Sequence, residues 1–217
     1  MTRIECAVAT HGNLSMKLLT EQDGRALPVG EVLLSRPPRI ALLDPDRIFW
    51  SSLMMFGPRL DNPVSTNLVI SEDTRSVAEQ IWGQPFTVAE NEESAVFSPT
   101  QELLPETVRV LEVTTRSLSM ERRETNDSVL QVLPLDQFNG TLATLFDIAV
   151  TTNAVMEARR LHGEGSEALG SIAIASCFAP ALQATHLNLR DDVPVIDFDD
   201  RIESTLKQLN LTAGFGQ

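Results

Sequence analysis

The stretch SIAIASCFAP, residues 171–180, sets the first expectation for the fold. SIAIAS at 171–176 is a short apolar run, continuous rather than alternating, and it ends directly before Cys177. Such a run is typical of a strand in a parallel sheet that is covered on both faces. We therefore expect a strand at 171–176, then a loop that carries Cys177, and then a helix at 180–189.

The rest of the chain alternates between strand-like and helix-like segments. The pattern predicts strands at 3–10, 29–35, 86–90 and 129–135, and helices at 47–57, 74–83, 139–162 and 199–211. The helix at 139–162 has one apolar face at steps of three and four, although the β-branched residues at 150–152 count against it. Strands that alternate with helices indicate an α/β fold.

Composition limits the classes of partner. The chain has 217 residues and a formal net charge of −13, so it repels phosphate backbones, and nucleic acid is not an expected partner. No apolar run reaches the roughly 18 residues of a membrane span, so no membrane association is expected. The opening MTRIECAVATHGNL lacks the basic start and apolar core of a signal peptide. We expect a cytoplasmic protein.

The sequence lacks the familiar motifs for cofactors and metals. It contains no GxGxxG, no Walker sequence and no GxSxG, which leaves dinucleotide, nucleoside-triphosphate and serine-hydrolase functions without support. Cys6 and Cys177 are far apart and more typical of free thiols than of a disulfide. The histidines are scattered, at His11, His162 and His186. We therefore expect neither a cofactor nor a metal site.

Two segments of the chain resemble each other. Residues 40–67 and 172–199 each contain a short apolar strand, a proline-bearing loop, a helix, a polar turn with Arg and Asp, and then Pro-Val. A duplication would give two similar α/β halves, 1–92 and 93–217, with the last helix free to pack on the first half. The alternative is chance, because α/β proteins repeat this order of elements in general. Loops after equivalent strands would line a shared cleft.

Cys177 and the pair Asp44 and Asp46 are candidate functional residues. A thiol placed at a strand end, just before a helix, would have a lowered pKa, whereas a small buried core residue is the alternative for Cys177. Asp44 and Asp46 lie in the matching loop of the first half, and capping of the following helix is their alternative. Thr10 and His11 follow the first strand, where either a turn or a ligand contact fits.

Two quoted segments resemble a known family. SIAIASC, followed by a helix and VPVID, resembles the second cysteine loop of the aspartate/glutamate racemase superfamily. SAVFSPTQELLPETVRVLEV resembles the strand and helix that open the second half of those proteins, notably in the AroM-like branch. The resemblance covers about residues 94–211, and it reaches 38–90 only through the internal similarity.

The resemblance implies two flavodoxin-like halves with parallel sheets, related by a pseudo-twofold axis, and cofactor-independent chemistry on a small carboxylate. Racemases and epimerases of the superfamily use one cysteine from each half. Cys177 matches the second, whereas the first position falls near Asp44 and Asp46 and holds no cysteine. A lone second-half cysteine resembles the arylmalonate decarboxylase branch. The groups expected to hold the carboxylate are Thr10, His11, Ser98, Thr100, Ser176 and Phe178.

Two functions therefore remain open. One is an isomerase or decarboxylase in which Cys177 is the acid/base and Asp44 or Asp46 replaces the missing thiol, with its pKa raised by burial. The other is a catalytically inactive relative that binds a small ligand or a partner protein. The missing first cysteine favours the second function. Both are compatible with a homo-oligomer.

Overall fold

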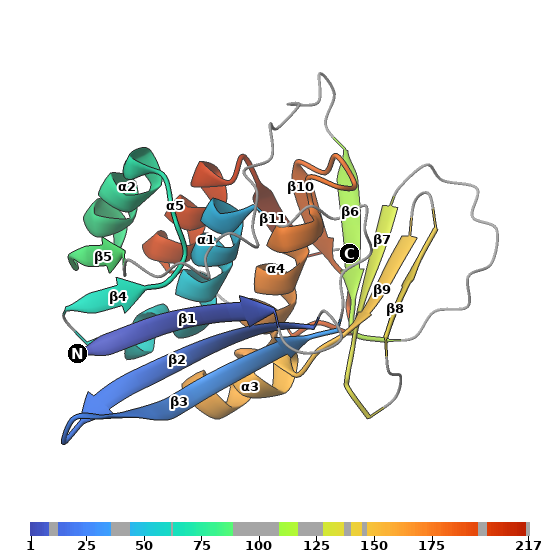
Figure 1. Cartoon of the computed structure of the whole chain (residues 1–217). Helices are drawn as coiled ribbons and strands as arrows, with labels where there is room; N and C mark the ends of the chain where they lie inside the picture. Colours follow the sequence, from blue (N-terminus) through green and yellow to red (C-terminus); the bar gives the residue numbers. More distant parts are fainter. Residues whose placement is uncertain are drawn as a thin grey trace.

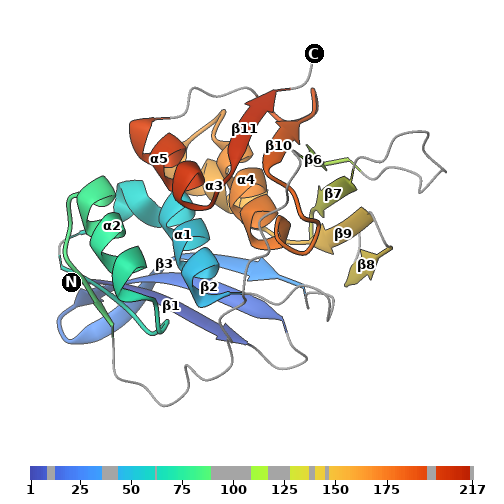
Figure 2. The same cartoon turned by 90° about the horizontal axis from the view of Figure 1, so that it is seen from above.

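The computed structural model of the protein describes residues 1–8, 13–35, 44–61, 63–88, 109–116, 128–136, 140–144, 147–194 and 199–215. These residues form two β-sheets with helices between them (Figure 1). Seen from above, the two sheets lie on either side of the helices (Figure 2). The predicted α/β class is therefore confirmed.

The first sheet has five strands in the order β3-β2-β1-β4-β5. β1, β2 and β3 form an antiparallel meander, whereas β4 and β5 run parallel to β1. The turn between β2 and β3 has positive φ at Asp23 (53°) and Gly24 (70°), as a two-residue type I′ hairpin requires. The strands are β1 Thr2–Val8, β2 Leu14–Gln22, β3 Arg25–Leu34, β4 Val64–Thr66 and β5 Phe86–Val88.

The second sheet has six strands in the order β11-β10-β6-β7-β9-β8. All neighbours are parallel except β8, which is antiparallel to β9. β7 is buried from Val129 to Leu133, and its sequence there is apolar except for Gln131, as is typical of a parallel strand covered on both faces. The strands are β6 Val110–Thr114, β7 Ser128–Leu133, β8 Thr141–Ala143, β9 Asp147–Thr151, β10 His186–Leu189 and β11 Thr212–Phe215.

Two buried helices, α1 and α4, form the centre of the molecule. Every residue of α1 except Asp46 is buried, and every residue of α4 except Glu167 and Leu169 is buried. Both helices belong to one continuous hydrophobic core that reaches from the first sheet to the second. The helices are α1 Pro45–Phe56, α2 Glu72–Trp82, α3 Ala154–His162, α4 Glu167–Phe178 and α5 Asp200–Gln208.

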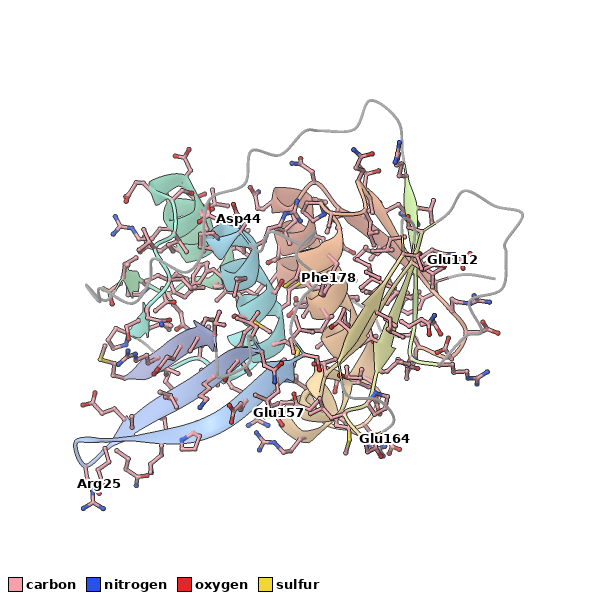
Figure 3. The ribbon with its side chains drawn as sticks, turned by 45° about the vertical axis from the view of Figure 1, so that its right-hand side comes forward. Arg25, Asp44, Glu112, Glu157, Glu164 and Phe178 are labelled. Carbon is pink, nitrogen blue, oxygen red and sulfur yellow. The ribbon has the colours of Figure 1, made fainter. Side chains whose placement is uncertain are left out.

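The outer edge of β3 is covered by residues from the second half of the chain. The side chain of Asn153 accepts a hydrogen bond from Leu33 N (2.7 Å) and donates one to Glu31 O (2.8 Å), so its amide continues the ladder of the sheet. Beside it, Glu157 of α3 accepts a hydrogen bond from Glu31 N (2.9 Å). Figure 3 shows Glu157 where α3 meets β3. The covered part of the edge, at Glu31 and Leu33, is therefore not available to pair with another chain.

The prediction for the opening stretch is wrong. Residues 171–176 lie inside α4 and form no strand. A helix buried on all sides is apolar all round, so it has no 3.6-residue pattern that would separate it from a buried strand. The helical signal was the presence of Ala168, Ala173 and Ala175, since alanine is the strongest helix former.

Two further helix predictions need correction. Within 139–162 the structure has strands β8 and β9, and the helix begins only at Ala154. The β-branched residues at 150–152 favoured the strand, as expected for side chains that are stiff at χ1. At 180–189 the chain makes a turn with a positive φ at Gln183 and then enters β10. The helices predicted at 47–57, 74–83 and 199–211 are confirmed as α1, α2 and α5.

Both sheets are mixed, whereas the resemblance implied parallel flavodoxin-like sheets. The antiparallel meander of β1 to β3 accounts for the difference in the first sheet, because short hairpin turns replace the helical crossovers that parallel neighbours need. The boundary at 92/93 between the expected halves lies outside the described residues. Among the described helices, none is long and apolar enough to cross a membrane.

Candidate functional site

Asp44 and Asp46 both act as hydrogen-bond acceptors at helix starts. Asp44 is the N-cap of α1 and accepts from the backbone N–H groups of Asp46 (2.8 Å) and Arg47 (3.3 Å). Asp46 accepts from Ser71 N (2.8 Å), Ser71 Oγ (2.7 Å) and Thr74 Oγ1 (3.0 Å), which ties the start of α2 to the start of α1. Both carboxylates thus satisfy helix ends, the alternative that the sequence left open.

Cys177 lies in the last turn of α4 and not at the start of a helix. Its side chain is 2% exposed, and its thiol donates to Ser51 Oγ of α1 at 3.2 Å. Burial raises the pKa of the Cys177 thiol, although the hydrogen bond with Ser51 and the charge of Arg47 act in the opposite direction. The dipole of a helix C-terminus also disfavours a thiolate. The described surroundings therefore keep this thiol protonated and out of contact with solvent.

Cys6 is buried on the other side of α1. It lies on β1, and its sulfur is 3.8 Å from Ser52 Oγ, which also donates to Met16 Sδ at 3.4 Å. Burial raises the pKa of Cys6 to about 12. The adjacent residues Ser51 and Ser52 thus each face one thiol, Cys177 and Cys6. This arrangement accommodates polar atoms between α1 and its neighbours without forming an exposed reactive centre.

Ser176 and Phe178, the neighbours of Cys177, are fully buried. Ser176 Oγ donates back to Ile172 O at 2.8 Å, within α4. The guanidinium of Arg47 donates to Ser176 O and to Leu209 O, both at 3.2 Å, and so stabilises the C-terminal ends of α4 and α5. Figure 3 shows Phe178 in the interior of the molecule and Asp44 at the end of α1.

The remaining predicted site residues, Thr10, His11, Ser98 and Thr100, lie outside the described residues. Of the five predicted residues that are described, Cys177, Ser176 and Phe178 are together only because they follow one another on α4, and all three are buried. The described part of the chain contains no group of three His, Cys, Asp or Glu side chains placed to hold a metal ion.

A cavity of about 400 Å³ lies elsewhere, on the face of the first sheet that points away from α1. We call it the first-sheet cavity. One cross-strand row forms its floor: Arg3 of β1 is paired with Leu19 of β2 and with Ser65 of β4, and Ser65 is paired with Thr87 of β5. The complete lining is Met1, Arg3, Leu19, Thr20, Glu21, Gly24, Ala26, Ser65 and Thr87.

The alternation of β1 puts Arg3 on this face. Thr2, Ile4 and Cys6 are buried toward the helices, whereas Arg3 and Glu5 between them are half-buried on the opposite face. Arg25, next to the lining residues Gly24 and Ala26, marks the hairpin end of the sheet in Figure 3, far from Phe178. The first-sheet cavity is therefore separate from the site predicted around Cys177.

Arg3 is the one guanidinium in this lining. Its Nε atom is shielded from solvent and has no hydrogen-bond partner among the described residues. Glu5 Oε2 is 3.8 Å away, within ion-pair range but too far for a hydrogen bond. Thr20, Ser65 and Thr87, which carry hydroxyl groups, also line the cavity. A guanidinium with an unused donor beside hydroxyl groups is suited to receive a carboxylate.

Comparisons with protein-family models, curated proteins and solved structures find no match for this chain. Sequence reasoning missed Arg3 because its surroundings come from strands that are distant along the chain, up to Thr87. The available signal was the alternation within RIEC, which puts Arg3 and Glu5 on the polar face of the first strand.

Proposed function

We propose that this protein is a non-catalytic binding module that takes a small carboxylate in the first-sheet cavity. The observation that carries the proposal is Arg3 Nε, which is shielded from water and lacks a hydrogen-bond partner among the described residues. A bound carboxylate would accept that N–H together with a second guanidinium N–H, which is the usual bidentate geometry. The cavity volume, about 400 Å³, lies in the range of small-molecule sites.

The chemical character of the lining residues limits the class of ligand that the cavity can bind. Met1, Leu19 and Ala26 provide apolar surface, while Arg3 is the only cationic side chain in the lining. Glu21 would repel a second negative charge. A monocarboxylate with an apolar tail therefore fits the lining better than a dicarboxylate does.

The rival proposal is a single-thiol enzyme resembling the aspartate/glutamate racemases. Such an enzyme needs Cys177 to reach its substrate and to exchange a proton near the working pH. Burial and the raised pKa of this thiol count against both requirements. The binding module needs no reactive thiol, which is why we favour it.

We also propose that the two sheets arose from one duplicated arrangement. In each, the first strand along the chain lies inside the sheet: β1 has β2 and β3 on one side and β4 and β5 on the other, while β6 has β7, β9 and β8 on one side and β10 and β11 on the other. The strand directions differ, because β2 is antiparallel to β1 whereas β7 is parallel to β6. The sequence similarity of segments 40–67 and 172–199 does not support this proposal. When the two segments are aligned, helix α1 of the first segment corresponds to the end of α4 and to strand β10 in the second, which are different elements. The support lies in the strand order.

Calorimetric titration with 3-phenylpropanoate tests the binding proposal. We expect saturable binding that Arg3→Gln weakens by about 10- to 100-fold, the cost of removing hydrogen bonds to a charged group. Arg75→Gln is a matched control, because Arg75 is 38% exposed against 37% for Arg3, is also near a glutamate, and lies outside the cavity. Cys177→Ser should bind like the wild type. Absence of binding to the wild type, or an equal loss of affinity in both arginine variants, would refute the proposal.

A further inference from the structure

We infer that the first-sheet cavity selects zwitterions, namely α-amino acids with a large apolar side chain, through Glu21 acting together with Arg3. The inference rests on the proposed function, since it assigns the ligand class of the same cavity. It adds a second recognition element, a carboxylate for the ligand's ammonium group, and it makes Glu21 the residue that determines specificity.

Backbone pairing fixes the position of Glu21. Glu21 N donates to Met1 O at 3.0 Å, which continues the β1/β2 ladder beyond the pair of Thr2 and Thr20. Leu19 and Glu21 are two residues apart on β2 and therefore point to the same face. Leu19 is directly opposite Arg3, so Glu21 is the diagonal neighbour of Arg3, with its Cα about 7–8 Å from the Cα of Arg3 in the geometry of antiparallel strands.

The side chains of Arg3 and Glu21 therefore start from neighbouring positions on one face of the sheet. No ion pair joins Arg3 to Glu21 among the described residues, and both residues line the cavity. The carboxylate and ammonium groups of an α-amino acid are attached to one carbon, so one such ligand can meet the guanidinium on one side and the Glu21 carboxylate on the other. Attraction of opposite charges fixes the orientation of the ligand.

The other acidic groups on this face are already engaged. Glu31 accepts from Ser15 Oγ at 2.8 Å and lies 3.2 Å from Lys17 Nζ. Glu5 lies beside Arg3 at 3.8 Å. Glu21 is exposed and makes no ion pair with any described residue, so it is the carboxylate available to an incoming ammonium group.

The size and the apolar part of the lining indicate the side chain. A cavity of about 400 Å³ is larger than the two charged groups need, and Met1, Leu19 and Ala26 line it. An aromatic or long aliphatic side chain would cover this apolar surface and remove it from water. L-Phenylalanine is therefore the probe, and 3-phenylpropanoate, which has the same skeleton without the ammonium group, is its matched partner.

The test is calorimetric titration of the wild type with both compounds. We expect L-phenylalanine to bind about three- to tenfold more tightly, a modest factor because Glu21 is exposed and its charge is screened. Glu21→Gln should remove this preference and leave 3-phenylpropanoate binding unchanged or tighter. Glu203→Gln removes an exposed carboxylate from α5, outside the cavity, and should preserve the preference.

The outcomes separate this inference from the function on which it rests. Equal binding of both compounds to the wild type, or a preference that survives in Glu21→Gln, overturns the zwitterion inference and leaves carboxylate binding intact. Binding of neither compound overturns both. Because Glu21 is exposed, its variant should keep the thermal midpoint of the wild type, and the wild-type comparison needs no variant at all.

Discussion

Gly170 holds the backbones of α3 and α4 in contact, so Gly170→Ala is a sensitive test of the central layer. A Cβ at this position would lie 2.4 Å from Ala154 O, 2.6 Å from Ala154 C and 2.8 Å from Val155 N. All three are backbone atoms of the first turn of α3, and no side-chain rotation can move them away. The shortest of these contacts is 1.0 Å inside the 3.4 Å at which ordinary van der Waals contact begins.

Two effects of opposite sign decide the result. In an exposed helix, replacing glycine by alanine stabilises by about 0.8–1.0 kcal/mol. Overpacking of a filled core costs about 1–3 kcal/mol, and a clash with backbone belongs at the upper end of that range. We expect a net loss of about 1–2 kcal/mol. For a chain of this size, that loss lowers the thermal midpoint by about 2–8 °C.

Scanning calorimetry of the wild type and the variant measures this shift. Ser76→Ala is the matched control, because it introduces alanine at an exposed position of α2 and should change stability by less than about 0.5 kcal/mol. A Gly170→Ala protein that is as stable as the wild type, or more stable, would refute the close packing of α3 against α4. It would also undermine the assignment of residues 167–178 as a buried helix.

Three further predictions concern the edge of β3 and the two thiols. Asn153→Ala removes both hydrogen bonds to β3 and should lower the free energy of unfolding by about 1–3 kcal/mol in urea titrations; an unchanged midpoint would contradict this. Burial alone would raise the pKa of Glu157, but its hydrogen bonds with Arg160 and the β3 backbone lower it below the ordinary 4.5. The ionised Glu157 carboxylate therefore stabilises the folded protein fully above pH 4.5, and this stabilisation is lost as the pH falls through the lowered pKa of the folded state. Acid unfolding should show this loss in the wild type and not in Glu157→Gln. Cys6 and Cys177 should resist iodoacetamide at neutral pH until urea unfolds the protein, and mass spectrometry of the native protein would expose any early alkylation.

The helices that sequence reasoning identified carry local end signals. The side chains of Asp44 and Ser71 accept hydrogen bonds at the starts of α1 and α2, and Gly83 ends α2 in the left-handed conformation. These signals need no tertiary context, because a cap acts within one turn. α4 has no such signal: Ser166 makes no capping hydrogen bond, and burial on all sides removes the amphipathic pattern.

The candidate cavity could not be predicted from the sequence, for a different reason. Its floor combines Arg3, Leu19, Ser65 and Thr87 from four strands, and their meeting depends on strand order and register. Register follows from how whole strands pair, which short windows of sequence do not contain. The alternation within β1 predicts only that Arg3 points away from the core.

The covering of β3 also has a consequence for synthesis. Leu33 and the Asn153 side chain that pairs with it are 120 residues apart along the chain. Ribosomes add about 5–20 residues per second, so this interval lasts about 6–24 seconds. Throughout it, the growing polypeptide presents an unpaired strand edge to neighbouring nascent chains, and such edges are templates for aggregation. Slow translation of the second half should therefore lower the soluble yield.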